Sequence, residues 1–358
     1  MKKNILDDQK YIEKKDSKLM LKSLELVQKQ VEDIARDITK ISIPSFYKKI
    51  KNIIFLGMGG STLGSHVIKS AFFSNLKYPV EIVNGYHIPA FLDKDSLVIV
   101  SSYSGTTEEP LAAAKEALQK KAKILSITSG GELEKWSKKN KIPALIFDTK
   151  NNPCGSPRMG LGYSIVGQIL LLSKIGVLKF SSADVNSFVK IIDKYRNKWG
   201  VKTGVNENFA KQLAEDTLGR SVWYVGSEHL GGSVHIGANQ MNENAKRFAG
   251  YFLIPELNHH LLEGGMFPKS NTKNILFILV ESNLYDKKIQ KRYEITKKIL
   301  AQNKINFRVY RSQERSPLAQ VAEVLLLTSY TSFYSAILEG LDPTAIPFVD
   351  FFKAELKK

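Results

Sequence analysis

The chain has 358 residues, of which 43% are apolar and 24% charged, a composition typical of globular proteins that excludes a disordered or fibrous chain. Its 52 Lys and Arg residues outnumber its 35 Asp and Glu residues, which gives a formal net charge of +17. The single cysteine, Cys154, excludes an internal disulfide, and apolar runs such as 167–173 and 274–280 are shorter than the ~20 residues of a membrane-spanning helix.

The positive charge is distributed over the whole chain as short lysine clusters such as Lys120-Lys121 and Lys297-Lys298. Because no long basic block and no helix-turn-helix pattern accompanies them, we expect no nucleic-acid partner and assign most of the charge to the surface. The N-terminus has basic residues but no apolar stretch after them, unlike a secretory signal. The sequence therefore predicts a cytoplasmic protein with no membrane partner.

Residues 1–44 are predicted to form a helical segment ahead of the first domain. From Leu19 to Ile41, apolar residues recur mainly at three- and four-residue spacing among Lys, Glu and Asp, which is the pattern of an amphipathic helix. Pro44 cannot continue a helix and disfavours helical geometry at Ile43, so the helix ends there.

A first α/β domain is predicted over residues 45–180. Short apolar runs alternate there with helical patterns, and strands separated by helices of about ten or more residues imply parallel pairing in a doubly wound sheet. The expected strands are 52–56, 97–100, 123–127 and 144–147, and the expected helices begin at Ser61 and cover 109–119 and 160–175.

A second α/β domain is predicted over residues 205–358, after a looser stretch at 176–205. Its expected strands are 221–225, 251–254, 274–280 and 306–310, separated by helices, and a further helix is expected at the C-terminus. Glycines and a serine stand between a strand and a helix in both halves, at 57–61 and at 231–233. We therefore predict two similar doubly wound domains related by duplication.

Two loops of the first domain have the composition of a phosphate site. Gly57-Met-Gly-Gly-Ser61 lies between a predicted strand and a predicted helix, where backbone amides can approach an anion. The loop 101–107 carries five hydroxyls around one glycine, which is more than the single hydroxyl that a helix cap requires. Neither loop has the spacing of a dinucleotide fingerprint or a P-loop, so no nucleotide cofactor is expected.

These motifs, Gly59-Gly-Ser61, Ser102-Tyr-Ser-Gly-Thr-Thr107 and Pro157-Arg158, resemble those of the sugar-isomerase (SIS) domain family. The resemblance implies flavodoxin-like domains and a bound phosphosugar. It also implies that the following residues surround the substrate phosphate: Gly60, Ser61, Ser102, Ser104 and Thr107. Thr106 stands where the family often has Asn, which keeps a hydrogen-bonding side chain at that position.

The second half gathers groups that move protons. Glu243, Lys246, Glu256, His259 and His260 fall within about twenty residues, and a carboxylate beside an imidazole suits an aldose–ketose isomerase. The adjacent histidines His259 and His260 diverge on a helix or strand, so no metal is expected, although a single His with a carboxylate remains an alternative.

The segments Asn242-Glu-Asn-Ala-Lys246 and Pro255-Glu-Leu-Asn-His259, with Lys353 in the C-terminal 349–356, resemble the bifunctional phosphoglucose/phosphomannose isomerases. That family has tandem SIS domains and acts in glycolysis and gluconeogenesis without a cofactor. The resemblance implies that Glu243 is the base, that His259 promotes ring opening from a neighbouring subunit of a homodimer, that Lys353 assists at the ring oxygen and that Arg158 stabilises the enediolate.

Each of these residues also has a purely structural interpretation. Glu243 could pair with Lys246 or Arg247 at helical spacing, Lys353 could be a surface residue, and Arg158 could cap structure after Pro157. The family often has Asn-His-Asn-Glu where this chain has Asn258-His-His-Leu, so the role of His260 and the use of mannose 6-phosphate stay open.

Two other functions remain as alternatives. A non-catalytic phosphosugar-binding regulator would use the same domains, but such proteins usually carry a DNA-binding helix-turn-helix. The second alternative is a different phosphosugar isomerase or the isomerase module of an amidotransferase. The absence of an N-terminal glutaminase argues against the amidotransferase module. The preferred prediction is interconversion of fructose 6-phosphate with glucose 6-phosphate and mannose 6-phosphate.

Overall fold

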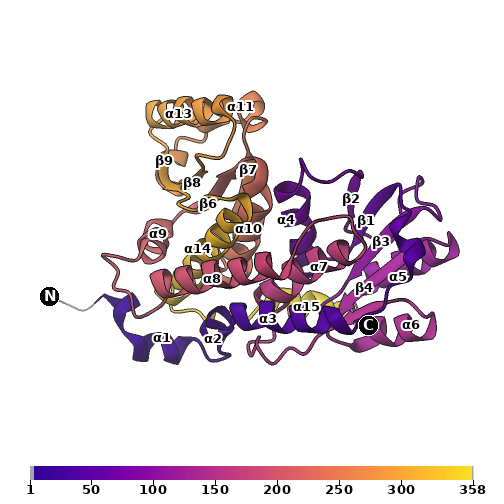
Figure 1. The fold of residues 1–358 in the computed structure, drawn as a ribbon. Coiled ribbons are helices and arrows are strands. Elements are labelled where there is room, and N and C mark those ends of the chain that lie inside the picture. Colours follow the sequence, from indigo (N-terminus) through magenta and orange to yellow (C-terminus); the bar gives the residue numbers. More distant parts are fainter. Residues whose placement is uncertain (1–3, 357) are drawn as a thin grey trace. The chain divides into compact units, whose positions relative to one another are not determined.

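The computed structural model describes residues 4–356 and 358, and the chain divides into two compact units (Figure 1). The first unit is Glu25–Asp193, and the second consists of the described residues of Met1–Leu24 together with Lys194–Lys358. The helical segment predicted at 1–44 is thus shared between the two units. Each unit is described by itself below.

The first unit is built on a five-stranded parallel sheet in the order β2-β1-β3-β4-β5. The strands are β1 (Asn52–Leu56), β2 (Val80–Val83), β3 (Ser96–Ser101), β4 (Lys123–Thr128) and β5 (Ala144–Ile146). β3 and β4 are buried along their whole length, which explains why the centre of β3, Leu97–Val100, is an apolar run without alternation. β2 was missed because only four residues, all partly or fully exposed, form this edge strand.

Helices cover both faces of this sheet. Ile124 packs with Ala113, Ala117 and Leu133 of α5 and α6, whereas Ile127, three residues further along β4, points toward Gly167 of α7. Since side chains three apart on a strand lie on opposite faces, the sheet is doubly wound. The helices are α3 (Val27–Asp37), α4 (Leu63–Ala71), α5 (Glu108–Gln119), α6 (Gly131–Lys139) and α7 (Gly167–Lys174), and one π-helical turn, Gly162–Val166, precedes α7.

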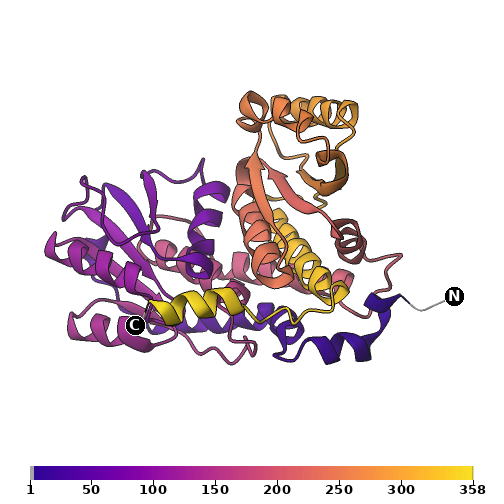
Figure 2. The same cartoon turned by 180° about the vertical axis from the view of Figure 1, so that it is seen from behind.

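The second unit repeats this plan with a four-stranded parallel sheet in the order β7-β6-β8-β9, which corresponds to β2-β1-β3-β4. The strands are β6 (Ser221–Gly226), β7 (Ala249–Leu253), β8 (Ile275–Glu281) and β9 (Asn306–Arg311). The helices are α9 (Phe209–Thr217), α10 (Gly231–Ala245), α11 (Leu257–His260), α12 (Asn271–Asn274), α13 (Lys287–Gln302), α14 (Pro317–Leu338) and α15 (Pro347–Glu355). α10 and α14 lie side by side, and α15 follows as a separate helix (Figure 2). The prediction of two similar parallel-sheet α/β domains is confirmed.

The predicted N-terminal helix is broken into shorter pieces: α1 (Gln9–Lys15), α2 (Met20–Glu25) and α3. Asp16 ends α1, and its carboxylate accepts the amides of Met20 and Leu21 at 2.7 and 2.8 Å, which starts α2. Leu19 between them has φ +61°, outside the helical region. Local capping therefore overrides the apolar periodicity.

Two long helices were not predicted. The stretch 176–205, where the sequence pattern is looser, contains α8 (Ser182–Trp199), an 18-residue helix. α14 has 22 residues and is the one helix in the part of the chain described here that is long and apolar enough to cross a membrane, with 94% of its apolar window buried inside the fold. It is the core helix of the second unit, and the sequence prediction missed it.

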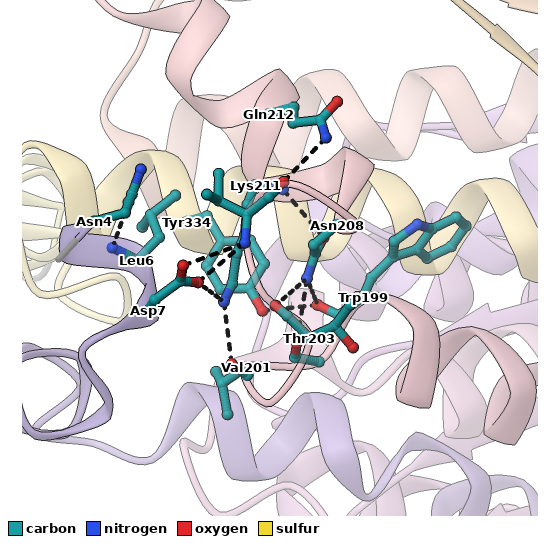
Figure 3. A network of polar contacts seen from close by, with 12 residues as sticks. Asn4, Leu6, Asp7, Trp199, Val201, Thr203, Asn208, Lys211, Gln212 and Tyr334 are labelled. Atoms are coloured by element: carbon teal, nitrogen blue, oxygen red, sulfur yellow. Dashed lines mark hydrogen bonds and ion pairs between the residues drawn. The ribbon is translucent and has the colours of Figure 1, made fainter. Parts of the chain in front are cut away.

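A buried polar network ties the N-terminal segment to α9 within the second unit (Figure 3). The ammonium of Lys211 donates to Asp7 Oδ1 at 2.9 Å and to the Val201 carbonyl at 3.0 Å, and it lies over the Tyr334 ring at 5.4 Å. Asn208, the N-cap of α9, donates to the Trp199 carbonyl at 3.0 Å. The contact of Lys211 with Asp7 joins segments 204 positions apart in sequence.

Candidate active site

The two predicted phosphate loops meet at the switch point of the first sheet. In the order β2-β1-β3-β4-β5 the direction in which strands are added reverses between β1 and β3, and ligands of such sheets bind beyond the carboxyl ends of these strands. The loop 57–61 follows β1, and the loop 101–107 follows β3. Parallel pairing of the two strands brings the loops together.

Ser61 joins the two loops. Its hydroxyl accepts the amide of Tyr103 at 2.9 Å, and its carbonyl accepts the hydroxyl of Ser101 at 2.7 Å and the side-chain amide of Gln168 at 3.1 Å. Ser61 is buried, so these bonds fix the spacing of the loops.

The remaining hydroxyls of the second loop bond to one another rather than capping α5. Ser102 donates to the Thr107 hydroxyl at 3.1 Å and accepts the Gly105 amide at 3.1 Å, and the hydroxyls of Ser104 and Thr106 lie 3.0 Å apart. Thr107 is the N-cap residue of α5, but its side chain makes no capping hydrogen bond. Ordinary capping therefore does not account for this loop, and the first turn of α5 has no side-chain cap at the helix end that attracts anions.

Glycines allow close backbone approach at this site. A Cβ on Gly60 would lie 2.7 Å from the Arg158 amide, and one on Gly105 would lie 1.9 Å from the Gly130 carbonyl oxygen. Gly105 also has φ +69°, which only glycine adopts without strain. Gly60 thus packs directly on the backbone of Pro157 and Arg158, and this brings the predicted arginine to the phosphate loops.

Arg158 is almost completely buried, with 2% of its surface exposed. The segment before it is held by Asn152, which donates to the Tyr103 hydroxyl at 2.8 Å and to the Ser156 carbonyl at 2.9 Å. Burial raises the pKa of Tyr103 to about 12, so this phenol stays protonated. Sequence reasoning did not single out Tyr103 or Asn152, and the position of Tyr103 inside the serine-rich loop was the available signal.

Glu243, the predicted base, lies half-buried in the last turn of α10 in the second unit. Its neighbours fix this turn: Asn242 donates to the Ala249 carbonyl at 2.8 Å and accepts the Ala249 amide at 3.1 Å, and Asn244 donates to Ser332 at 3.0 Å. Of the basic residues that follow, Lys246 donates to the carbonyls of Asn244 and Asp342, and Arg247 pairs with Glu339.

His259 is exposed on the short helix α11. The residue before it, Asn258, donates to the Thr296 hydroxyl of α13 at 2.8 Å, which fixes the helix. His260 does not share this environment, since its Nε2 lies 2.7 Å from the Glu256 carboxylate, and it makes a tilted ring contact with Phe252.

Lys353 lies on α15, a helix without a buried residue. Of its side chains, Phe348, Phe351 and Phe352 are 86%, 67% and 61% exposed. The structure thus places the predicted residues Gly60, Ser61, Ser102, Ser104, Thr107 and Arg158 on the loops of the first unit, and Glu243, His259 and Lys353 on three elements of the second. Among residues 4–356 and 358, no group of three or more His, Cys, Asp and Glu side chains could hold a metal ion.

Two family models match the chain. Residues 46–141 match the SIS domain, and residues 206–356 match the bacterial phospho-glucose isomerase C-terminal SIS domain. Among solved structures, a hypothetical protein from Thermus thermophilus is similar with a TM-score of 0.74 at 16% identity, covering 98% of this chain and 93% of that one. This likeness shows the fold.

Relatives of known name are similar over nearly their whole length. A bifunctional phosphoglucose/phosphomannose isomerase from Caldicellulosiruptor bescii is 29% identical over 342 residues, which are 94% of this chain and 98% of the relative. One of the same name from Aquifex aeolicus is 30% identical over 335 residues, which are 91% of this chain and 94% of the relative. On this similarity, and with both halves matching SIS domains, the chain belongs to the bifunctional phosphoglucose/phosphomannose isomerase family.

Proposed function

We propose that this protein is an aldose–ketose isomerase that interconverts fructose 6-phosphate with glucose 6-phosphate and with mannose 6-phosphate. The observation that carries the proposal is the loop 101–107, whose hydroxyls lie at the switch point of the sheet without capping α5. Neutral donors around a helix N-terminus suit a phosphate monoester. The names of the relatives support the reaction class.

In the proposed reaction, Glu243 takes the proton from C2 of the open-chain aldose and returns it to C1. The carbonyl next to C2 acidifies that proton, so the proposal includes no metal and no nucleotide. The negative charge that develops on the enediolate oxygens would be stabilised by the guanidinium of Arg158, whose burial strengthens such an interaction. Ring opening would precede this step. His259 would transfer a proton during ring opening, and Lys353 would assist at the ring oxygen.

The two basic residues that follow Glu243 contact groups on other elements of the second unit. Arg247 pairs with Glu339, and Lys246 lies in the left-handed region at φ +52°, where α10 ends and the side chain turns toward the Asp342 carbonyl.

We further propose a cytoplasmic homodimer in which His259 acts at the site of the other subunit. Two features support this assembly: His259 is exposed, and α15 presents Phe348, Phe351 and Phe352 to solvent. Monomeric proteins rarely expose such contiguous apolar surface. A role in glycolysis and gluconeogenesis would follow from the substrates.

The experiment that tests the function is a coupled assay with fructose 6-phosphate, glucose 6-phosphate and mannose 6-phosphate, run with EDTA present, on the wild type and on Glu243→Gln. We expect activity in the wild type and at least a ~100-fold loss of turnover in Glu243→Gln, with phosphosugar binding retained. Glu132→Gln, an exposed glutamate on α6, serves as the control. Near-normal turnover in Glu243→Gln would exclude Glu243 as the base, and binding without turnover in the wild type would indicate a regulator.

A further inference from the structure

The second unit contains an apolar cavity of about 150 Å³ between its sheet and the helices α11 and α13. The sheet contributes Trp223, Val225 and Phe277, α13 contributes Leu300, and Leu257 and Leu261 form the wall next to α11. The cavity is partly open to solvent, since Gly264 in its lining is exposed. The corresponding face of the first sheet is filled by the cluster around Ala113, Ala117 and Leu133.

The few polar residues that line the cavity direct their polar groups to the protein. Asn271 donates to the Phe267 carbonyl at 2.8 Å, and Asn303 donates to the Ile299 carbonyl at 3.1 Å. Thr296 donates to the Arg292 carbonyl at 2.8 Å and accepts from Asn258 at 2.8 Å. A buried water needs roughly two to four polar partners, and the lining of this cavity offers few. The cavity therefore favours an apolar occupant over water.

We propose that this cavity is a binding site for a neutral apolar molecule of about the size of benzene. An engineered apolar cavity of roughly this volume in another protein binds benzene or xenon. The occupant would gain contacts with the aromatic and aliphatic lining that the empty cavity lacks.

Occupancy of the cavity bears on His259, and this part of the inference rests on the proposed function. Leu257 and Leu261 line the cavity and bracket His259 in sequence, and Leu257 is 2% exposed. Asn258 bonds to Thr296, which also lines the cavity. A ligand between α11 and α13 therefore contacts the residues that fix the histidine, and it makes turnover sensitive to a molecule bound away from the substrate.

The binding test uses benzene with the full-length protein and follows the thermal midpoint Tm by calorimetry. We expect a saturable rise in Tm. Gly265→Leu should abolish it, because Gly265 lines the cavity and a Cβ there would meet only Ile305 Cγ1, at 3.8 Å, without a left-handed φ. Gly85→Leu, where a Cβ meets nothing within 4 Å, is the matched control and should respond like the wild type. An equal Tm rise in Gly265→Leu, or none in the wild type, would overturn the proposal.

A second variant covers the case in which Gly265→Leu does not fold. Leu300→Ala enlarges the cavity, so it should extend the Tm response from benzene to indole. If the Tm of Leu300→Ala responds to benzene but not to indole, this would contradict the assignment of the cavity as the binding site.

The coupling between the occupied cavity and turnover is measured separately from binding. Saturating benzene should change kcat of the wild-type isomerase and leave Gly265→Leu unaffected. Benzene binding with kcat unchanged would overturn the coupling to His259 alone, while absence of any isomerase activity would refute the proposed function and leave the Tm result standing.

Discussion

The ammonium of Lys211 lies 2.9 Å from the Asp7 carboxylate, although the side chain of Lys211 is entirely buried. Asp7 is 27% exposed and belongs to the N-terminal segment, so this ion pair holds that segment on α9, together with the hydrogen bond that Asn4 donates to Glu215 at 2.6 Å. A buried charge without its partner is far more costly than an apolar side chain of similar volume at the same place.

Asp7→Ala is therefore expected to lower the free energy of unfolding by about 3 kcal/mol, the lower end for a broken buried pair because Asp7 is partly exposed. Lys211→Met should cost less, and Asp7→Ala with Lys211→Met should be more stable than Asp7→Ala alone. Urea unfolding of the three variants measures this. Additive losses in the double variant would show that the two residues do not interact energetically.

Removal of one loop hydroxyl is expected to weaken anion binding without affecting stability. Ser104 is exposed and its hydroxyl bonds only within the loop, so Ser104→Ala should raise the Kd of inorganic phosphate by roughly 10-fold and leave Tm unchanged. Isothermal titration calorimetry measures this. Ser187→Ala, another exposed serine whose hydroxyl bonds to a nearby carbonyl, should bind like the wild type. Equal affinities in the two variants would place the phosphate elsewhere.

Two glycines with positive φ should respond differently to alanine. Gly105 has φ +69° and no room for a Cβ, whereas Gly59 has φ +48° and nothing within 4 Å of one. Gly59→Ala should cost roughly 1 kcal/mol for the left-handed backbone alone, and Gly105→Ala at least ~3 kcal/mol because the loop must also move away from Gly130. Chemical denaturation measures both losses, and equal losses in the two variants would contradict the close approach of Gly105 to Gly130.

Stability is expected to fall in mildly acidic solution. Burial lowers the pKa of His229 below its ordinary value of 6.5, although the bond to Gln320 opposes the shift, and burial lowers the pKa of His235 in the same direction. At low pH the unfolded chain therefore takes up protons that the folded chain does not. The stabilisation from the two neutral histidines is complete above the ordinary histidine pKa, and it is lost as the pH falls through the lowered pKa of the folded chain.

Urea unfolding at about pH 7.5 and about pH 5.5 should show a smaller free energy of unfolding at the lower pH. In His229→Gln the difference between the two values should shrink, because one of the two buried imidazoles is gone. If the variant retains the full difference, His229 does not contribute to it.

The central strands of both sheets could be predicted because burial on two faces gives continuous apolar runs, as in β1 and β8. α14 could not be recognised in this way, because hydroxyl residues interrupt its apolar sequence. In the fold most of its serine and threonine hydroxyls bond back to their own helix: Thr331 donates to the Leu327 carbonyl at 2.8 Å, and Ser335 donates to the Thr331 carbonyl at 2.9 Å. A helix that satisfies its own hydroxyls can be buried almost as completely as an apolar one.

The candidate site was predictable where its signal is local. The hydroxyl loop and the glycines that precede α4 stand next to strand ends in sequence, and parallel pairing places them together. The bond between Tyr103 and Asn152 joins residues 49 positions apart, and the approach of Gly60 to Arg158 depends on the same tertiary packing. No spacing rule in a single sequence contains such contacts.

The repeated sheet plan has a consequence for binding stoichiometry. At the second switch point, between β6 and β8, the buried Tyr285 hydroxyl accepts the Ser227 amide, and the Glu228 carboxylate accepts the Asp286 amide at 3.1 Å. The carboxylates of Glu228 and Asp286 thus stand at this switch point, and their negative charge repels a dianion. A phosphosugar titration is therefore expected to saturate at one equivalent per chain, with the phosphate bound at the first switch point alone.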